Sequence, residues 1–210
     1  MNDVTTPDLI RLFDRVADAI EADKDRLCQL DGVIGDADHG VTMSIGFTAV
    51  RAALKTLDPA TAEPTAVFNL AAKSFLNAVG ASSGPLYATA FMRAGAAMKG
   101  RATLDRDAMV AVVAAMSKGI QDRGKGERGD KTMLDAWIPA AEAAEAAASA
   151  GKDLAGCLEA AVAAAASGAE ATKAMVASKG RASRLGDRVL GHMDPGAASA
   201  VTILKALAEA

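Results

Sequence analysis

The sequence predicts an all-α protein, folded as an up-and-down barrel or bundle of eight antiparallel helices. Alanine, the strongest helix former, supplies much of the 51% apolar share, whereas aromatic residues make up only 3%. β-Branched residues are scattered, and no alternation of strands with helices can be read along the chain. Short connections join the helical segments, and short connections place consecutive helices antiparallel.

Capping and breaking residues delimit the helices. The first is expected to start at Thr6-Pro7, where a hydroxyl caps the helix and proline occupies its first turn, and to deliver Asp31 at its C-terminal end. Asp58-Pro59 ends the second helix. The later predicted helices cover about 40–57, 64–80, 85–98, 105–121, from 131 or 132 onward, 152–175 and 195–207.

Length and composition favour one soluble domain. The 210 residues are enough for a single sizeable core, so we expect one domain over 1–210. The formal net charge of −3 provides no basic surface for nucleic acid. We see no secretory signal and no membrane span, and the isolated Cys28 and Cys157 have the pattern of core residues. We therefore expect a cytoplasmic protein without a nucleic-acid or membrane partner.

The most informative stretch is 31–46, which reads DGVIGDADHGVTMSIG. Asp31, Asp36 and Asp38 fall within eight residues, among glycines, and no lysine or arginine occurs over 27–50. Carboxylates without a counter-charge must take up protons or bind a metal if they converge at a buried site. Oxygen ligands of this kind suit Mg²⁺, which often recruits substrate phosphates as further ligands.

The residues that follow, 39–42, have the pattern of a helix start. The free N–H groups of a first helical turn can hold an anion, so metal and phosphate would meet at one place. The alternative is an ordinary helix-connecting loop, because Asp and Gly are common in such loops. The aspartate spacing is not that of an EF-hand.

Four unusual connections carry most of the chemistry-bearing side chains. They are 31–40, 80–85, 122–132 and 180–195, and they follow the first, third, fifth and seventh predicted helices. In an up-and-down order, alternate connections lie at the same end of the barrel. The sequence therefore predicts a single site at one rim. Within the third of these loops, the segment 122–130 is rich in glycine and charge, and we expect it to be mobile.

Two of these loops have a phosphate-binding pattern and an ordinary alternative. The segment 80–84, GASSG, offers two hydroxyls and free amides before a helix, as a phosphate nest or a plain cap does. The segment 124–132 approaches the P-loop pattern, but Asp130 interrupts it and no strand precedes it. The P-loop mechanism is therefore excluded, and a solvated charged loop is the alternative.

The remaining candidates are two histidines and two arginines. His39 and His192 form no Glu-x-x-His pair, which argues against a carboxylate-bridged di-iron bundle. Arg181 and Arg184 lie before the segment GHMDPG. An arginine near a phosphate site can stabilise charge during phosphoryl transfer, although a plain surface arginine is the alternative.

Taken together, the four loops resemble those of one family. The motifs are DGVIGDADHG at 31–40, GASSG at 80–84, GDKTMLD at 129–135, and GRAS with GHMDPG at 180–183 and 191–196. In this order they resemble the nucleotide-binding L domain of dihydroxyacetone kinases over essentially the whole chain. The resemblance implies a barrel of eight antiparallel helices with the nucleotide at one rim.

The resemblance also implies roles for individual residues. Asp31, Asp36 and Asp38 match carboxylates that hold two Mg²⁺ ions, and Arg181 is the residue expected to act in catalysis. The matches to ADP or ATP contacts are His39, Gly40, Val41, Thr42, Ser82, Ser83, Gly124, Thr132, Met133, Arg181, Asp194, Pro195 and Gly196. Ala37 departs from the family, which usually has glycine there; if the position needs a positive φ, alanine costs about 1 kcal/mol.

The resemblance implies that this chain is one subunit of a kinase. The ketose-binding half, with its covalent histidine, is not found in these residues, so a separate K subunit would carry dihydroxyacetone or another short ketose. Two donors remain open: a phosphohistidine-carrying M subunit of the phosphoenolpyruvate system that rephosphorylates a held ADP, or freely exchanging ATP. A homodimer is also open. The alternative from another class is a non-catalytic, nucleotide-loaded regulator of a transcription factor.

Overall fold

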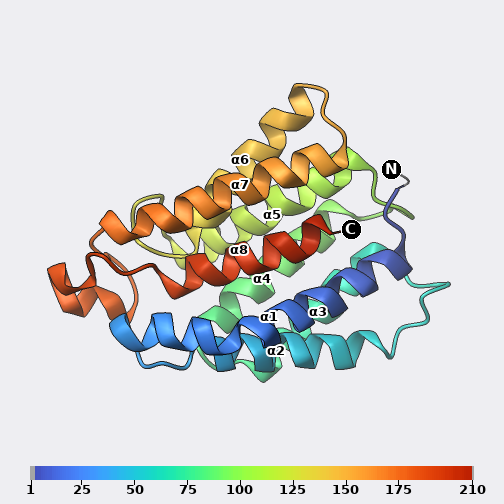
Figure 1. Ribbon diagram of the computed structural model, residues 1–210. Helices are drawn as coiled ribbons and strands as arrows, with labels where there is room; N and C mark the ends of the chain where they lie inside the picture. The colour runs from blue at the N-terminus through green and yellow to red at the C-terminus, as the bar shows by residue number, and fades with distance from the viewer. Residues whose placement is uncertain (1–2, 210) are drawn as a thin grey trace.

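The computed structural model describes residues 3–209, and its α-helices form a closed up-and-down barrel (Figure 1). The helices are α1 (Thr6–Ile34), α2 (His39–Leu54), α3 (Pro64–Ala78), α4 (Ser83–Ala97), α5 (Arg106–Gly124), α6 (Leu134–Ser149), α7 (Leu154–Ala171) and α8 (Pro195–Ala208). Two 3₁₀ segments, η1 (Thr172–Ala174) and η2 (Arg181–Val189), connect α7 to α8. Each helix packs against the next, and α8 packs against α1 to close the ring. The predicted all-α barrel is confirmed.

Local chemistry explains where several helices begin and end. Thr5, not the predicted Thr6, caps α1: its backbone N–H donates to the Asp8 carboxylate at 2.9 Å, and its hydroxyl accepts from the Asp8 N–H at 3.4 Å. Helix α1 continues to Ile34, so Asp31 lies inside its last turn. Helix α6 begins at Leu134 rather than at 131 or 132, because the preceding loop needs left-handed backbone there.

The aromatic residues of the core are distributed unevenly among the helices of the barrel. The five Phe, one Tyr and one Trp of the chain are all buried, and they come from α1, α2, α3, α4 and α6. Their rings stack edge to face or tilted, with centroids 5.3 to 6.4 Å apart. Such pairs contribute about 0.5–1.5 kcal/mol each beyond area burial. Helices α7 and α8 bury no aromatic residue, and alanine is the residue that they bury most often. This explains how a chain with so few aromatic residues fills a barrel of this size.

Small side chains let α6 and α7 approach closely. A Cβ added at Gly168 would lie 1.9 Å from the Asp135 carbonyl oxygen, so no larger residue fits between the two backbones. Among residues 3–209, the stretch Leu154–Ala174 is the one helix long and apolar enough to cross a membrane by composition. Here it packs between α6 and α8 as part of the barrel.

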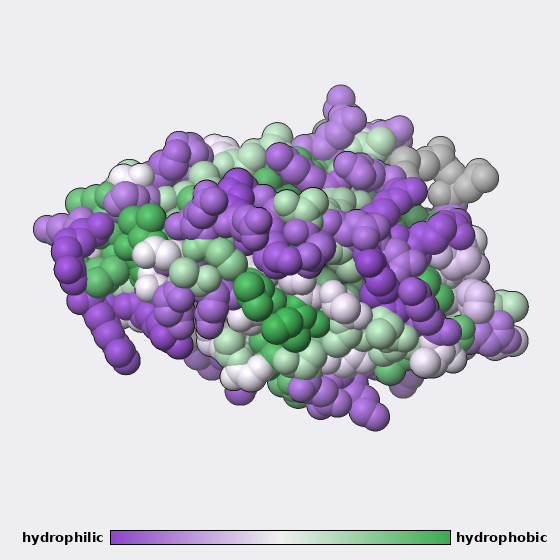
Figure 2. Space-filling view, turned by 60° about the horizontal axis from the view of Figure 1, so that its bottom comes forward, coloured by the Kyte–Doolittle hydropathy of each residue, from purple (hydrophilic) through white to green (hydrophobic). Residues whose placement is uncertain are grey.

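The barrel has two different ends. The chain termini and the plainer connections lie at one end, and the connections after α1, α3, α5 and α7 lie together at the other, on the left in Figure 1. The face turned forward in Figure 2 is mainly hydrophilic, with a hydrophobic area near its middle. Exposed apolar side chains include Val41 and Ile45 of α2. The position of the four loops in Figure 1 confirms the prediction that they gather at one rim.

We expect Gly168→Ala to destabilise the protein by about 1–3 kcal/mol, although alanine normally favours a helix interior. The reason is the Asp135 carbonyl, which is fixed backbone and cannot move aside cheaply. Urea unfolding followed by circular dichroism measures the change. Gly156→Ala, in the first turn of the same helix, is the matched control and should stay within about 1 kcal/mol of wild type, since its nearest neighbours are side-chain atoms of Asp153 and Lys152. Equal stabilisation by both changes would contradict the close-contact explanation.

Candidate functional site

A cavity of about 840 Å³ opens at the rim where the four loops meet. One side carries the carboxylates of Asp31, Asp36 and Asp38. The apolar part of its lining includes Ile34, Pro85, Leu86, Ile120, Met133 and Leu134. A site with one acidic polar side and one apolar side suits a ligand that is itself part charged and part planar or apolar.

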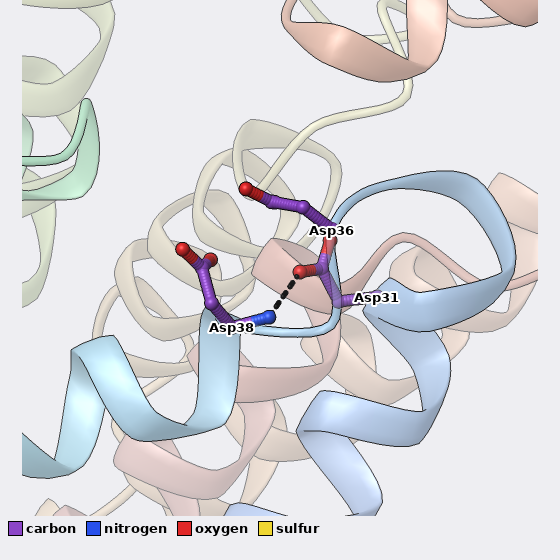
Figure 3. Close-up of side chains that lie close together, drawn as sticks. All are labelled: Asp31, Asp36 and Asp38. Atoms are coloured by element: carbon purple, nitrogen blue, oxygen red, sulfur yellow. Dashed lines mark hydrogen bonds between the residues drawn. The ribbon is translucent and has the colours of Figure 1, made fainter.

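Asp31 organises the acidic side of the cavity. It lies in the last turn of α1 and is only 8% exposed. Its Oδ2 accepts the backbone N–H of Asp38 at 2.9 Å (Figure 3). The same oxygen accepts the backbone N–H of His39 at 3.2 Å. A Cβ at Gly35 would lie 2.1 Å from the Asp31 Oδ1, so glycine is required where the chain turns beside this carboxylate. The loop is therefore folded around Asp31.

The three carboxylates converge closely enough to hold a cation together. One oxygen from each of Asp31, Asp36 and Asp38 lies within 4.8 Å of the others. Burial raises the pKa of Asp38, and the negative charges of Asp36 and Asp31 raise it further. Arg181 reaches across from η2, with its Nη1 2.6 Å from the Asp36 Oδ2, and both side chains are partly exposed. Carboxylate oxygens with this little compensation are the donor set that Mg²⁺ favours.

Four helices begin at the cavity. The first residues of α2, α4, α6 and α8 (His39, Ser83, Leu134 and Pro195) are all in its wall. The first N–H groups of a helix lack partners within the helix and carry a partial positive charge. Several helix N-termini directed at one cavity favour an anionic ligand.

Asp194 and Lys131 form a buried link between two of the loops. Asp194 caps α8 by accepting the Ala197 N–H at 2.7 Å, and burial raises its pKa to about 7. Lys131 is 1% exposed and donates through Nζ to the carbonyl oxygens of Thr172 and His192. Burial lowers the pKa of Lys131, whereas the nearby Asp194 and Asp135 act in the opposite direction. This lysine ties the loop before α6 to the segment that enters α8.

The loop 125–133 is braced by carboxylates. Its backbone is left-handed at Lys125, Gly129 and Lys131, with φ of +53°, +98° and +59°. The buried Asp135 accepts the N–H of Gly129 at 2.6 Å and of Thr132 at 2.8 Å. The sequence prediction of a mobile loop over 122–130 needs correction in its bounds, since α5 continues to 124 and hydrogen bonds brace the rest.

Most of the residues singled out from the sequence line this cavity. They are Asp31, Asp36, Asp38, His39, Thr42, Ser82, Ser83, Gly124, Thr132, Met133, Arg181, Asp194, Pro195 and Gly196. Gly40 and Val41 are not in the wall. Gly40 is buried against the Lys24 carbonyl of α1, and the Val41 side chain is 45% exposed on the outside of α2. Either residue could therefore contact a ligand in the cavity only through its backbone atoms.

Sequence reasoning missed several cations in the wall. Lys131, Arg123 and Lys179 line the cavity together with Arg181 and Arg184. Charged residues in glycine-rich loops normally face solvent, so Lys131 was expected to be exposed. The one signal to the contrary was its position directly beside Thr132, in the motif that resembled a P-loop.

Comparison with known proteins places the chain in a family. A family model described as the DAK2 domain matches residues 33–209. The chain belongs to the DAK2 domain family. It is 38% identical over 202 residues to the ADP-binding subunit DhaL of the PEP-dependent dihydroxyacetone kinase of Escherichia coli, covering 95% of this chain and 94% of that subunit. It is 37% identical over 190 residues to the DhaL subunit of kinase 2 of Listeria innocua, covering 90% and 88%.

A solved structure has the same fold. The dihydroxyacetone kinase of C. freundii, crystallised with AMP-PNP and Mg²⁺, superposes with a TM-score of 0.74 at 28% identity. The match covers 100% of this chain and 35% of that kinase chain, so the chain spans about a third of the C. freundii enzyme. The resemblance stated from the four loop motifs is confirmed.

Ala37 supplies a test of strain in the acidic loop. Its φ is +63°, the conformation that favours glycine. We expect Ala37→Gly to raise the free energy of unfolding by about 0.5–1 kcal/mol, because relief of the left-handed strain exceeds the added entropy of the unfolded chain. Thermal and urea unfolding measure it. Ala52→Gly, at an exposed position of α2, should instead lower stability by about 1 kcal/mol; a loss of similar size at position 37 would refute the strain.

Asp194 predicts a pH dependence of stability in the ligand-free protein. Because its pKa is raised from 3.8 to about 7, the folded state binds more protons than the unfolded state between these values. Its contribution to the free energy of unfolding is therefore present below about pH 4 and is lost as the pH rises towards 7. Asp194→Asn, which can still cap α8, should remove this component.

The measurement is urea unfolding of wild type and Asp194→Asn at several pH values from 4 to 8. The stability of the variant relative to wild type should increase with pH across this window. Asp153→Asn is the control, because Asp153 caps α7 in the same way at an exposed position. A pH-independent difference for Asp194→Asn would show that this carboxyl is not buried as described.

Proposed function

We propose that this chain is the nucleotide-binding phosphotransferase subunit of a dihydroxyacetone or related short-ketose kinase. In this role it binds ADP or ATP with Mg²⁺ and passes the terminal phosphoryl group to a ketose held on a separate K subunit. The observation that carries the proposal is the convergence of three carboxylates, within 4.8 Å, on a cavity into which four helix N-termini open. The DhaL relatives of nearly the same length support it.

We propose Asp31, Asp36 and Asp38 as the ligands of two Mg²⁺ ions. The donor set fits: three carboxylates converge, and among residues 3–209 the one ion pair to them is that of Asp36 with the partly exposed Arg181. When bound, the metal would neutralise charge on the terminal phosphates. Asp31 is already rigid, since two backbone N–H groups hold one of its oxygens, whereas Asp36 would exchange its arginine partner for metal.

We propose that the rest of the cavity holds the nucleotide. Ser82 and Ser83 at the start of α4, and the first turns of α2 and α8, offer hydroxyls and free N–H groups for the phosphates. The apolar side, which includes Leu86, Ile120 and Met133, suits the planar base. Lys131 acts indirectly by fixing the position of the loop that leads into Asp194, Pro195 and Gly196.

Phosphoryl transfer needs positioning and charge stabilisation more than a protein nucleophile. Arg181 is placed for the second task, because its guanidinium already reaches the acidic loop and holds paired donors for phosphate oxygens. It is the first residue of the 3₁₀ segment η2 and lines the cavity. We assign Arg181 as the catalytic residue.

The partners and the phosphoryl donor follow from the same proposal. We propose a K subunit as the acceptor carrier, with either an M subunit or ATP as the source of the phosphoryl group, and the whole chain as one DhaL-type domain. The relatives named here are subunits of PEP-dependent kinases, which favours the held ADP. A regulator of a transcription factor finds no support in these relatives. A cytoplasmic location and a homodimer are further parts of this proposal.

The test is Mg²⁺-dependent nucleotide binding. We expect Asp36→Asn and Asp38→Asn to lose the Mg²⁺ dependence of ADP affinity in calorimetry while the fold survives, because each removes a charged ligand from a cluster of three. Asp107→Asn, at an exposed site in the first turn of α5 at the other end of the barrel, is the control and should bind as wild type does. Unchanged Mg²⁺ dependence in both cluster variants would sink the metal assignment.

Reconstitution tests the wider function. The isolated chain should not phosphorylate dihydroxyacetone with ATP, whereas adding a K-type subunit, with the phosphorylated M-type protein in a parallel arm, should produce turnover. Asp36→Asn should be inactive in the same mixture. Robust turnover by the isolated, homogeneous chain would refute the division into subunits.

Arg181→Ala should impair transfer more than binding. Its guanidinium is 70% exposed and paired with Asp36, so the fold does not depend on it. Loss of charge stabilisation should lower kcat by a factor on the order of 10 to 1000, with ADP affinity less affected. Steady-state kinetics with saturating partner, together with calorimetry, separate the two effects. If affinity and kcat/KM fall together while kcat is unchanged, Arg181 only grips the bound nucleotide.

A further inference from the structure

A chain of buried polar side chains runs from the core to His39 at the cavity. Trp137 Nε1 lies 3.4 Å from the Tyr87 hydroxyl. Burial raises the pKa of Tyr87 to about 12, an effect that the neighbouring Trp137 and Ser199 side chains oppose. The Ser199 Oγ lies 2.9 Å from the His39 Nε2. Trp137, Tyr87 and Ser199 are each 0% exposed. A polar chain in the apolar core of a barrel has to be satisfied at every member, so its hydrogen positions are constrained.

The constraint determines what His39 can do. A serine hydroxyl has one hydrogen, and that of Ser199 is donated to the Gly196 carbonyl oxygen at 3.0 Å. The carbonyl has no hydrogen to give, so Ser199 Oγ remains as an acceptor toward Tyr87 and His39. The contact at 2.9 Å then requires His39 to donate from Nε2. In the neutral ring, the hydrogen is therefore on Nε2 and the lone pair is on Nδ1.

The Nδ1 of His39 is accessible from the cavity. Among the described residues, the one buried side-chain nitrogen or oxygen without a partner is the Nε of Arg51. His39 Nδ1 has no hydrogen-bond partner within the described chain either, so it is not fully buried. His39 itself lines the cavity directly after Asp38. Its free acceptor is thus available to a ligand.

We propose that Ser199 is a positioning residue that fixes His39 in the Nε2–H tautomer, so that His39 offers a hydrogen-bond acceptor, not a donor, beside the aspartate cluster. An ionised phosphate brings only acceptors and gains nothing from this nitrogen. The ligand chemistry that matches is an O–H donor, either a water of a bound cation or a ligand hydroxyl. The tautomer is a property of the chain alone, whereas the identity of the O–H donor rests on the proposed function.

The same contact joins two parts of the site. His39 is the first residue of α2, and its N–H is held by Asp31. Ser199 lies one turn into α8, after the Asp194-Pro195-Gly196 turn. These helices have few other contacts with each other. The hydrogen bond therefore fixes the position of the aspartate loop relative to the N-terminus of α8. Its loss should change both the tautomer of the His39 ring and the affinity for the ligand.

The tautomer can be read directly by NMR. Long-range ¹H–¹⁵N correlation of the imidazole rings of the metal-free, uniformly labelled chain distinguishes the two tautomers. The chain has only two histidines, so a His192→Gln variant assigns the signals of His39. We expect the Nε2–H pattern in wild type. An Nδ1–H pattern there overturns the proposal, whatever the behaviour of any variant.

Variants test the part played by Ser199. Ser199→Ala should give a mixture of tautomers and weaken ADP–Mg²⁺ binding about 5- to 10-fold, the effect of one hydrogen bond. Ser117→Ala, which removes a buried hydroxyl from α5, and Tyr87→Phe, which leaves the His39–Ser199 contact in place, should keep the Nε2–H pattern. A Ser199→Ala spectrum identical to wild type would overturn the positioning role.

The proposed function and the proposed tautomer can be refuted independently of each other. If wild type binds no ADP with Mg²⁺, the proposed function fails, and the NMR result still decides the tautomer. To identify the O–H donor, Mg²⁺ alone and ADP alone are added to the labelled chain. A shift of Nδ1 with Mg²⁺ alone indicates a water of the cation, a shift with ADP alone indicates a nucleotide hydroxyl, and no shift with either or with both together overturns the acceptor role.

Discussion

The two hydrogen bonds that Asp31 accepts from the backbone of residues 38 and 39 hold the rest of the site in place. They bend the chain back at the end of α1, so that α2 starts beside a carboxylate in the last turn of α1. Asp36 and Asp38 are carried into the same small volume by this turn. The three carboxylates repel one another, but the packing of the loop against the barrel keeps them together. A bound cation would relieve this repulsion.

The architecture explains why the site is at one end. An up-and-down barrel fills its interior with side chains, here seven aromatic residues and many alanines. Helix ends, in contrast, present unpaired N–H groups, and alternate connections gather them at one rim. The four loops at this rim can therefore vary in chemistry while the packing of the helices is unchanged. Lys131 and the Asp135 carboxylate brace these loops from the core side.

Much of the site could be predicted from the sequence because its signals are local. The Asp31–Asp36–Asp38 cluster stands out since no basic residue is near it in the chain, and the helix starts are marked by Pro64, Pro195 and capping residues. The glycine usually found at position 37 raised the question of a positive φ there, and the structure answers it with a φ of +63° at Ala37. The capping residue of α1 was misplaced by one, because Thr5 and Thr6 are equally good caps and only the position of Asp8 distinguishes them.

The sequence by itself determined the all-α class, the order of the helices and the acidic character of the rim, since helix propensity, periodicity and local charge do not depend on distant residues. Tertiary structure alone decided which side chains meet. Arg181 pairs with Asp36, Lys131 is buried against residues 172 and 192, and His39 contacts Ser199 160 positions later. No local pattern encodes these contacts, because each one joins segments that are far apart in the sequence and that meet only when the helices pack into the barrel.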